Sequence, residues 1–291
     1  MSESLSRPAR PELLREPPTS GAFGVVTKPL SAWERVTNIG MARKLALLVV
    51  LALVWEGYAR WLANPLLFPT FSATLEAFVN GLFGGELLAR TVTSLRVLSL
   101  GYAAGILCAA ALTIVAISSR IGTDLLELLT SMFNPLPAIA LLPLALIWFG
   151  LGYGSIVFVI VHSVLWAVAL NTHSGFLSVS TTLRMVGRNY DLSGLRYVAR
   201  ILIPAAFPSI LTGLRIGWAF AWRTLIAAEL VFGVSSGSGG LGWFIYENKN
   251  QLEIPNVFAG LLMVIVIGLL IENVIFRWVE TRTVRRWGMQ N

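Results

Sequence analysis

Charged side chains interrupt the apolar segment Phe207–Phe232, which contains Arg215, Arg223 and Glu229. Ionisable groups at membrane depth are costly, so they usually face a protein interior or a water-filled path. Arg223 lies near the middle of this segment, where a guanidinium could contact an anion. The alternative is a structural Arg223, paired with Glu229 or with a backbone carbonyl of a neighbouring helix. The sequence leaves both interpretations open.

Tryptophans accompany these charges. Arg215, Trp222 and Glu229 are spaced seven residues apart, so they share one face of a helix, and Trp218 lies near that face. Such a mixture of charged and aromatic side chains is unlike a lipid-facing stripe. It is therefore a candidate lining for a translocation pathway.

Prolines mark a second candidate region, in which Asn134 begins the sequence Asn-Pro-Leu-Pro and Pro143 follows. Proline removes a backbone hydrogen bond and bends a helix. A bent helix here could line a pathway, or it could be a purely structural kink. The candidate pathway residues are Arg223, Glu229, Trp222, Trp218 and Asn134.

The other reactive residue types do not form a catalytic set. The single cysteine, Cys108, excludes an internal disulfide and a multi-cysteine zinc site. His162 and His173 lack a nearby carboxylate or cysteine, which favours buried, hydrogen-bonded histidines over a metal site. The glycine-rich segment 233–242 lacks the Gly-Lys-Ser/Thr ending of a phosphate-binding loop, and we expect a flexible external turn before a short helix near Trp243–Asn248. No catalytic residue, metal or cofactor is expected in this chain.

The composition indicates that these residues are positioned by a membrane protein. Of 291 residues, 56% are hydrophobic and only 13% are charged, whereas soluble domains average about 25% charged residues. The net charge of +7 could suggest a nucleic-acid partner, but its distribution along the chain fits membrane topology instead. The expected fold class is an all-α membrane protein, and no nucleic acid is expected as a partner.

Six segments are long and apolar enough to cross a bilayer, which takes about 20 helical residues. The helical form follows because lipid offers no partner for backbone N–H and C=O groups. The six expected transmembrane helices are Arg43–Leu62, Thr91–Ile117, Asp124–Phe149, Ser155–Phe176, Phe207–Phe232 and Asn256–Arg277.

Basic residues orient these spans, because cytosolic segments carry an excess of lysine and arginine. Most of them fall in the N-terminal segment, in the loop between the fourth and fifth spans, and after the sixth span. Both termini and that loop are therefore expected in the cytosol of a bacterium, with the protein multi-pass in its inner membrane. Residues 1–42 are expected to be a cytosolic tail, in which Ser31–Met41 is either an interfacial helix or an unstructured tether. Residues 43–291 form the expected transmembrane domain.

The cytosolic loop at 177–206 is too long for a turn and too polar to span. Apolar residues recur at helical spacing on both sides of Asp191, which predicts two short helices with a bend between them. Aspartate tolerates a left-handed backbone, so Asp191 suits the bend. An exposed helix pair with an apolar stripe could insert into the groove of a partner. An ordinary amphipathic surface loop is the alternative.

The loop resembles the EAA loop of ABC importer permeases, in which Glu-Ala-Ala, three residues, Gly and nine residues precede Ile-x-Leu-Pro. Met185-Val186-Gly187 stands at the first position, Asp191 at the glycine, and Ile201-Leu-Ile-Pro204 at the end. The sequence departs from the pattern at Met185 and Asp191. Residues Asn189–Gly194, Pro204–Gly217 and Ala227–Glu229 are similar to the nitrate, sulfonate, taurine and bicarbonate branch, as are Asn134–Ala138, Leu142–Leu144, Trp148–Gly150 and Asn171-Thr172.

This resemblance implies a type I importer permease whose loop couples to an ATPase. Pro204 and Pro208 would end the loop helix and set the entry to the fifth span. The implied coupling residues are Met185, Gly187, Arg188, Asn189, Tyr190, Asp191, Leu192, Ser193 and Gly194.

The implied function is the import of a small anion, such as nitrate, a sulfonate, taurine or bicarbonate. The implied partners are a second permease subunit, two ATPase subunits that bind ATP and Mg, a periplasmic or lipid-anchored solute-binding protein, and membrane lipid. A proton- or ion-coupled carrier is the alternative, although no internal repeat of the kind common in such carriers is evident. An integral-membrane enzyme would need a clustered catalytic set, and none is visible.

Overall fold

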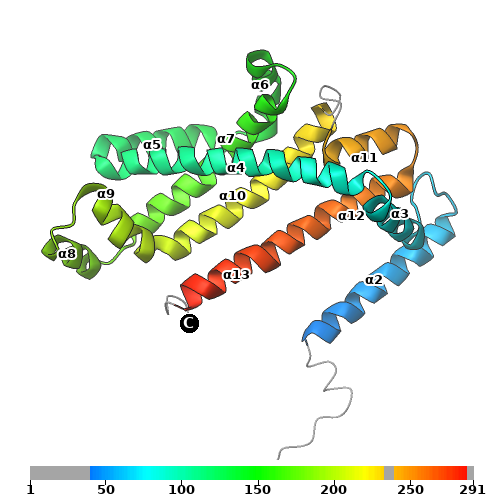
Figure 1. Cartoon of the computed structure of the whole chain (residues 1–291), viewed down its shortest axis with the longest axis horizontal. Helices are drawn as coiled ribbons and strands as arrows, with labels where there is room; N and C mark the ends of the chain where they lie inside the picture. Colours follow the sequence, from blue (N-terminus) through cyan, green and yellow to red (C-terminus); the bar gives the residue numbers. More distant parts are fainter. Residues whose placement is uncertain (1–39, 233–238, 287–291) are drawn as a thin grey trace, which may run out of the picture. The chain divides into compact units, whose positions relative to one another are not determined.

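A computed structural model of the chain describes residues 40–232 and 239–286. Those residues contain helices and connecting segments but no strand (Figure 1). In chain order the helices are α2 (Gly40–Leu62), α3 (Phe71–Phe83), α4 (Leu87–Ser118), α5 (Arg120–Phe133), η1 (Ala138–Leu141), α6 (Leu142–Phe149), α7 (Tyr153–Leu177), α8 (Thr181–Asn189), α9 (Gly194–Tyr197), η2 (Val198–Leu202), α10 (Ile203–Phe232), α11 (Leu241–Asn250), α12 (Ile254–Leu270), η3 (Ile271–Phe276), α13 (Arg277–Glu280) and η4 (Thr281–Arg285).

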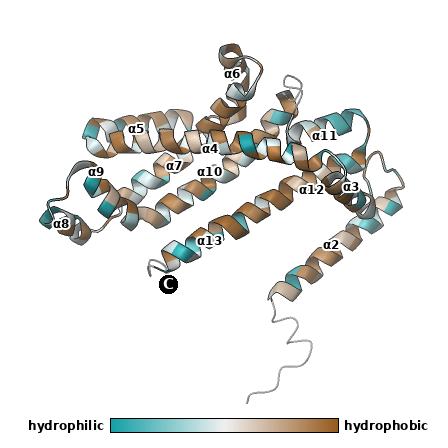
Figure 2. Ribbon diagram, in the orientation of Figure 1, coloured by the Kyte–Doolittle hydropathy of each residue, from teal (hydrophilic) through white to brown (hydrophobic). Residues whose placement is uncertain are grey.

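Within the described residues, five helical stretches are long and apolar enough to span a membrane, and a sixth arises if one bent helix pair counts as a span. Four predicted spans are confirmed to within a few residues as α2, α4, α7 and α10. The predicted sixth span is longer than expected and continues from Ile254 to Val284. Figure 2 shows hydrophobic residues along α12 and hydrophilic residues at α8 and α9.

The third predicted span, Asp124–Phe149, is not one helix. Helix α5 ends at Phe133, and the segment Ala138–Phe149 leaves it at an angle of 86°. The prolines explain the break, because neither Pro135 nor Pro137 can donate the N–H that would continue the ladder. The expected bent helix is therefore a broken one, with non-helical backbone at Asn134–Pro137.

The chain divides into two structural units, residues 1–51 and 52–291. The described part of the first unit is the start of α2, whose apolar side chains from Leu45 to Leu51 are mostly exposed. The expected interfacial segment Ser31–Met41 lies almost entirely outside the described residues.

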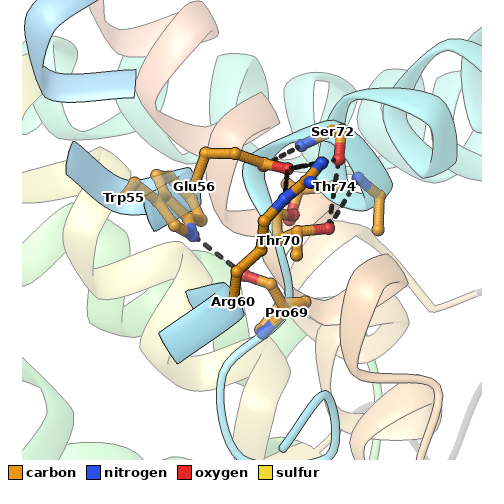
Figure 3. A network of polar contacts seen from close by, with 8 residues as sticks. Trp55, Glu56, Arg60, Pro69, Thr70, Ser72 and Thr74 are labelled. Carbon is orange, nitrogen blue, oxygen red and sulfur yellow. Dashed lines mark hydrogen bonds and ion pairs between the residues drawn. The ribbon is translucent and has the colours of Figure 1, made fainter. Parts of the chain in front are cut away.

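In the second unit, the remainder of α2 is joined to the start of α3 by polar contacts (Figure 3). Glu56 accepts hydrogen bonds from the backbone N–H and the hydroxyl of Ser72, both at 3.0 Å, and forms an ion pair with Arg60. The indole of Trp55 donates to the Pro69 carbonyl at 2.9 Å. Helix α3 was not predicted from the sequence, because 13 residues are too few to cross a bilayer.

Helices α4, α7 and α10 pack closely because glycines face the neighbouring helix. A β-carbon at Gly101 of α4 would lie 2.7 Å from Ile160 of α7, and one at Gly105 would lie 2.7 Å from Val164. A β-carbon at Gly213 of α10 would lie 2.8 Å from Asn171 of α7. Small residues allow such close approach between membrane helices. The core of the second unit lies at these contacts.

Helix α10 has no break where the sequence predicted one. The π-helical turn η2 joins α9 directly to α10, which contains Pro208. Pro204 and Pro208 therefore do not end the loop helix, and that prediction was wrong. A π turn, in which the Ile203 N–H bonds to the Val198 carbonyl, changes the backbone register locally and can accommodate a residue that lacks an N–H.

Candidate functional site

Helix α8 of the loop at 177–206 is defined at both ends by its own side chains and backbone. The Ser180 hydroxyl accepts the N–H of Leu183 and caps the start. At the other end, the Asp191 N–H bonds to the Arg188 carbonyl and the Leu192 N–H bonds to the Gly187 carbonyl. This pair of bonds is a Schellman motif, which requires a left-handed residue after the helix.

Asp191 occupies that left-handed position, with φ of 51°. This confirms the predicted bend. Aspartate and asparagine are the residues that tolerate such a backbone best after glycine. The side chain of Asp191 is exposed, so its charge is not buried by the turn.

Gly187 lies at a close contact between α8 and the helix that follows the bend. A β-carbon at Gly187 would lie 2.7 Å from the ring of Tyr197 and 3.2 Å from Ile201. Gly187 is buried, although its neighbours Arg188 and Asn189 are exposed. The two parts of the loop are therefore packed together rather than independent.

Arg184 joins α8 to the end of α7. Its Nε donates to the Val179 carbonyl at 3.1 Å and its Nη2 to the Phe176 carbonyl at 2.7 Å. The last carbonyls of a helix have no partner within the helix, so a guanidinium satisfies them and complements the negative end of the helix dipole. In the sequence, Arg184 served only as one of the basic residues that predict a cytosolic loop. Its contact with the end of α7 was not predicted.

The loop exposes large apolar side chains among its polar ones. Met185 is 62% exposed and Tyr190 is 76% exposed, and Leu195 is also exposed. Leu192 is half-buried. The remaining predicted coupling residues are exposed, namely Arg188, Asn189, Asp191, Ser193 and Gly194. We call Met185, Tyr190 and Leu195 the loop patch.

Of the predicted pathway residues, Glu229 lies in a buried polar cluster. It is 4% exposed, and both carboxylate oxygens accept from the Ser94 hydroxyl, at 2.7 and 2.8 Å. The Gly242 N–H donates to Glu229 at 2.9 Å, and the Leu241 N–H donates to the Ser94 oxygen at 2.7 Å. The cluster therefore fastens the start of α11 to α4 and α10.

The same cluster changes the interpretation of the glycine-rich segment. Residues 233–238 lie outside the described part of the chain. Gly240, however, is so close to the cluster that a β-carbon there would lie within 2.3 Å of the Ser94 hydroxyl. The Arg90 guanidinium donates to the Gly239 carbonyl at 3.1 Å. The expected helix near Trp243–Asn248 is confirmed as α11.

Trp222 and Trp218 lie among core side chains. The Trp222 indole donates to the Val264 carbonyl at 3.2 Å, and the side chain is buried. The Trp218 ring packs edge-on against Tyr102, at 5.5 Å between ring centroids. Arg215, on the same helical face, forms an ion pair with Glu280 at 3.0 Å.

Arg223 and Asn134 are brought together at the break after α5. Both line a pocket of about 200 Å³, with His162, Ser163 and Trp166 of α7. Arg223 is exposed, and its guanidinium lies 5.8 Å from the Phe220 ring centroid. Among the described residues, no carboxylate forms an ion pair with Arg223, and Glu229 bonds elsewhere.

Residues 101–286 match the model of the family described as the binding-protein-dependent transport system inner membrane component. That range includes both the loop at 177–206 and the broken span. The chain belongs to this family. The permease is thus the membrane component of an importer that works with an ATPase and a substrate-binding protein. Family membership supports this function over the ion-coupled carrier left open by the sequence.

Relatives of the permease cover most of its length. It is 32% identical to a nitrate import permease of Synechocystis, over 80% of this chain and 86% of the relative. It is 29% identical to the taurine transport permease of Escherichia coli, over 82% of this chain and 88% of the relative. It is 26% identical to a bicarbonate transport permease of Synechococcus elongatus, over 90% and 94% of the two chains.

Three functional contacts of the permease were missed by sequence reasoning. Ser94 gives no signal by itself, because its partner Glu229 lies 135 positions away. Arg184 was counted only as a topology signal. Trp166 was not singled out from the sequence, and only the structure places it at the pocket that Arg223 and Asn134 line.

Proposed function

We propose that the permease works as a pair in the bacterial inner membrane and imports a small anion delivered by a solute-binding protein. Two ATPase subunits, which bind ATP and Mg, dock on the cytosolic side, where both termini of the permease also lie. The observation that carries this proposal is the loop patch. It is an exposed apolar surface on a helix pair fastened to two spanning helices, as a docking element must be.

The patch can transmit force because α8 is attached on both sides. Arg184 attaches it to the end of α7, and Gly187 packs it against Tyr197. From Tyr197 the helix continues through η2 into α10. A displacement of α8 by closing ATPase subunits would therefore move α7 and α10 rather than only the loop.

A small anion is favoured by the named substrates of three relatives, which are nitrate, taurine and bicarbonate. The charge at Arg223 is consistent with such a cargo. An exposed guanidinium in an apolar span is too costly to face lipid, so it belongs against a partner or a polar path. Glu229, Trp222 and Trp218 are better described as packing residues. The polar groups of Glu229 and Trp222 bond to neighbouring helices, and the Trp218 ring packs against Tyr102.

The docking proposal is tested by placing a charge on the loop patch. Tyr190→Asp and Leu195→Asp should each reduce co-purification of the ATPase subunit or uncouple ATP hydrolysis from uptake by about tenfold, because a carboxylate entering an apolar groove loses its hydration. The control is Leu252→Asp, which charges an equally exposed leucine outside the loop. Assembly and uptake that survive both loop variants would contradict the docking assignment.

The substrate proposal is tested separately in proteoliposomes that contain the permease, its ATPase and its binding protein. Uptake of nitrate, taurine and bicarbonate is measured with and without ATP. We expect ATP-dependent accumulation of at least one of these anions. Accumulation of none of them, in liposomes with binding-protein-stimulated ATPase activity, would exclude the proposed substrate class while leaving the permease function intact.

A further inference from the structure

The break between α5 and η1 leaves backbone without helical hydrogen bonds inside a predicted span. Asn134, Pro135, Leu136 and Pro137 connect the two helices, which meet at 86°. Irregular backbone at membrane depth is tolerated only where it is buried in protein or lines a cavity that holds water. The pocket of about 200 Å³ lies at this connection and is lined by all four residues.

Another part of the pocket wall comes from α7 and contains buried polar atoms without hydrogen-bond partners. Trp166 is only 7% exposed, and its indole Nε1 has no hydrogen-bond partner among the described residues. Both ring nitrogens of His162 are also buried and without a partner in the same part of the chain. Buried polar groups are rarely left unpaired, so these groups require an explanation such as a bound ligand or water.

The ring of Trp166 is held in place by its neighbours. It stacks on Phe133 at 5.8 Å between centroids with 9° between the ring planes, and His162 packs edge-on against it at 6.0 Å. Phe133 is the last residue of α5, so the orientation of the indole N–H depends on the break itself. A pocket whose donors are fixed in advance binds with less loss of conformational freedom.

Helix α10 contributes a positive charge to the pocket. Arg223 lines the pocket from α10, and it is the only charged residue among those that line it in the described structure. A cation without a carboxylate partner, beside unpaired N–H donors, favours a ligand that is negative and rich in acceptors.

We propose that this pocket is an oxyanion-binding subsite of the translocation pathway, in which Arg223, the Asn134 side chain, the Trp166 N–H and His162 hold the transported ion. The inference rests on the proposed function, because it concerns the path of the same cargo. It adds His162 and Trp166 as residues that determine specificity, neither of which was among the predicted pathway residues.

The size of the pocket restricts the ligand. With a water molecule occupying about 30 Å³ of liquid, a volume of about 200 Å³ holds a small oxyanion and a few waters. Pockets for drug-sized molecules run from about 300 to 1,000 Å³. Nitrate, bicarbonate or a short sulfonate therefore fits this subsite, whereas a drug-sized molecule exceeds it.

The test uses a single cysteine in the assembled transporter. Cys108 is replaced by serine, and Ser163→Cys places a thiol on the pocket wall, where the hydroxyl of Ser163 bonds to the Ile160 carbonyl. The thiol is then modified with methanethiosulfonates of similar size, one anionic and one cationic. Ser99→Cys is the matched control, because its hydroxyl makes the same kind of bond to the Leu95 carbonyl on an exposed face of α4.

We expect the anionic reagent to modify Ser163→Cys at least about tenfold faster than the cationic one. Millimolar nitrate or bicarbonate should slow that reaction, and Arg223→Ala should remove the charge preference, whereas Arg223→Lys should keep it. The Ser99→Cys control should show no charge preference. Equal rates for the two reagents, or a thiol that stays unreactive both with and without ATP, would overturn the subsite.

A second measurement distinguishes loss of a hydrogen-bond donor in the pocket from a general loss of folding. Trp166→Phe keeps an aromatic ring at this position but loses the N–H and part of the indole volume, so it should lower nitrate or bicarbonate uptake about tenfold while the complex still assembles. Trp222→Phe is the control for loss of an indole N–H that already has a partner. Unchanged uptake in Trp166→Phe would contradict the subsite, while the loop and substrate tests above would still decide the proposed function on their own.

Discussion

The backbone of Gly187 lies against the ring of Tyr197, so closely that a β-carbon at Gly187 would come within 2.7 Å of the ring. This contact joins the exposed helix α8 to the helix that leads into α10. The family pattern carries alanine at this place, and here the absence of any β-carbon lets the aromatic ring pack on the helix backbone. The position of the loop patch therefore depends on this contact as well as on the hydrogen bonds of Arg184.

Gly187→Ala should weaken coupling, because overpacking a close contact costs about 1–3 kcal/mol. We expect a lower melting temperature of the purified complex and reduced uptake for each ATP hydrolysed. The double variant Gly187→Ala with Tyr197→Leu should recover part of both. Gly57→Ala is the control, since a β-carbon at Gly57 meets nothing within 4 Å. Wild-type coupling in Gly187→Ala would show that the contact is not needed.

Asp191→Gly should be tolerated and should slightly raise stability, because glycine adopts positive φ without strain. Asp191→Val should lower stability by about 1–2 kcal/mol, since a β-branched residue is strained at a φ of 51°. Thermal unfolding in detergent compares the two variants. A valine variant as stable as the glycine one would contradict the role assigned to the left-handed turn.

Arg184→Gln should separate α8 from the end of α7. Two charge-assisted hydrogen bonds are lost, each worth about 1.5–3 kcal/mol when desolvated and less at this half-buried site. ATPase activity of the complex should persist while uptake falls. Arg196→Gln, at an exposed arginine beyond the bend, is the control and should have little effect. Equal behaviour of the two variants would remove the special role of Arg184.

Ser94→Ala should destabilise the permease by about 1–3 kcal/mol, because the Leu241 N–H and the Glu229 carboxylate both lose a buried partner. Glu229→Gln should cost less, since an amide oxygen can still accept from Gly242. Neither variant should change the relative uptake of nitrate and bicarbonate. A change in that ratio would return Glu229 to the translocation pathway. Ser99→Ala, on the exposed face of α4, is the control.

The hydropathy of the sequence was enough to predict where four of the spans lie. It failed at Asp124–Phe149, because average hydropathy does not register the 86° break that two prolines cause. It also missed α3, which is too short to be recognised as a span. The sequence also failed to predict that the loop helix continues without a break into α10. Pro204 was expected to end that helix, but a π turn accommodates it.

Residues of the candidate site could be predicted where their role depends on the local sequence, and could not be predicted where it depends on contacts between distant positions. Asp191 was placed correctly in the bend, because its preference for a left-handed backbone is a property of the residue itself. The pairing of Ser94 with Glu229 could not be predicted, because it joins positions 135 residues apart. Likewise, Arg223 and Asn134 were each found separately, but only the fold shows that they share a pocket with Trp166.

The absence of a break between α9 and α10 has a mechanical consequence. The helical stretch Gly194–Val231 contains 38 residues, which at about 1.5 Å per residue makes a lever arm of roughly 57 Å. The docking surface lies at the end that begins with Gly194, and Arg223 and Glu229 lie toward the other end. Rotating such a rod by about 5° about one end displaces the other by roughly 5 Å, about one turn of helix. An ATPase would therefore need only a small stroke to open or close the far side of the membrane.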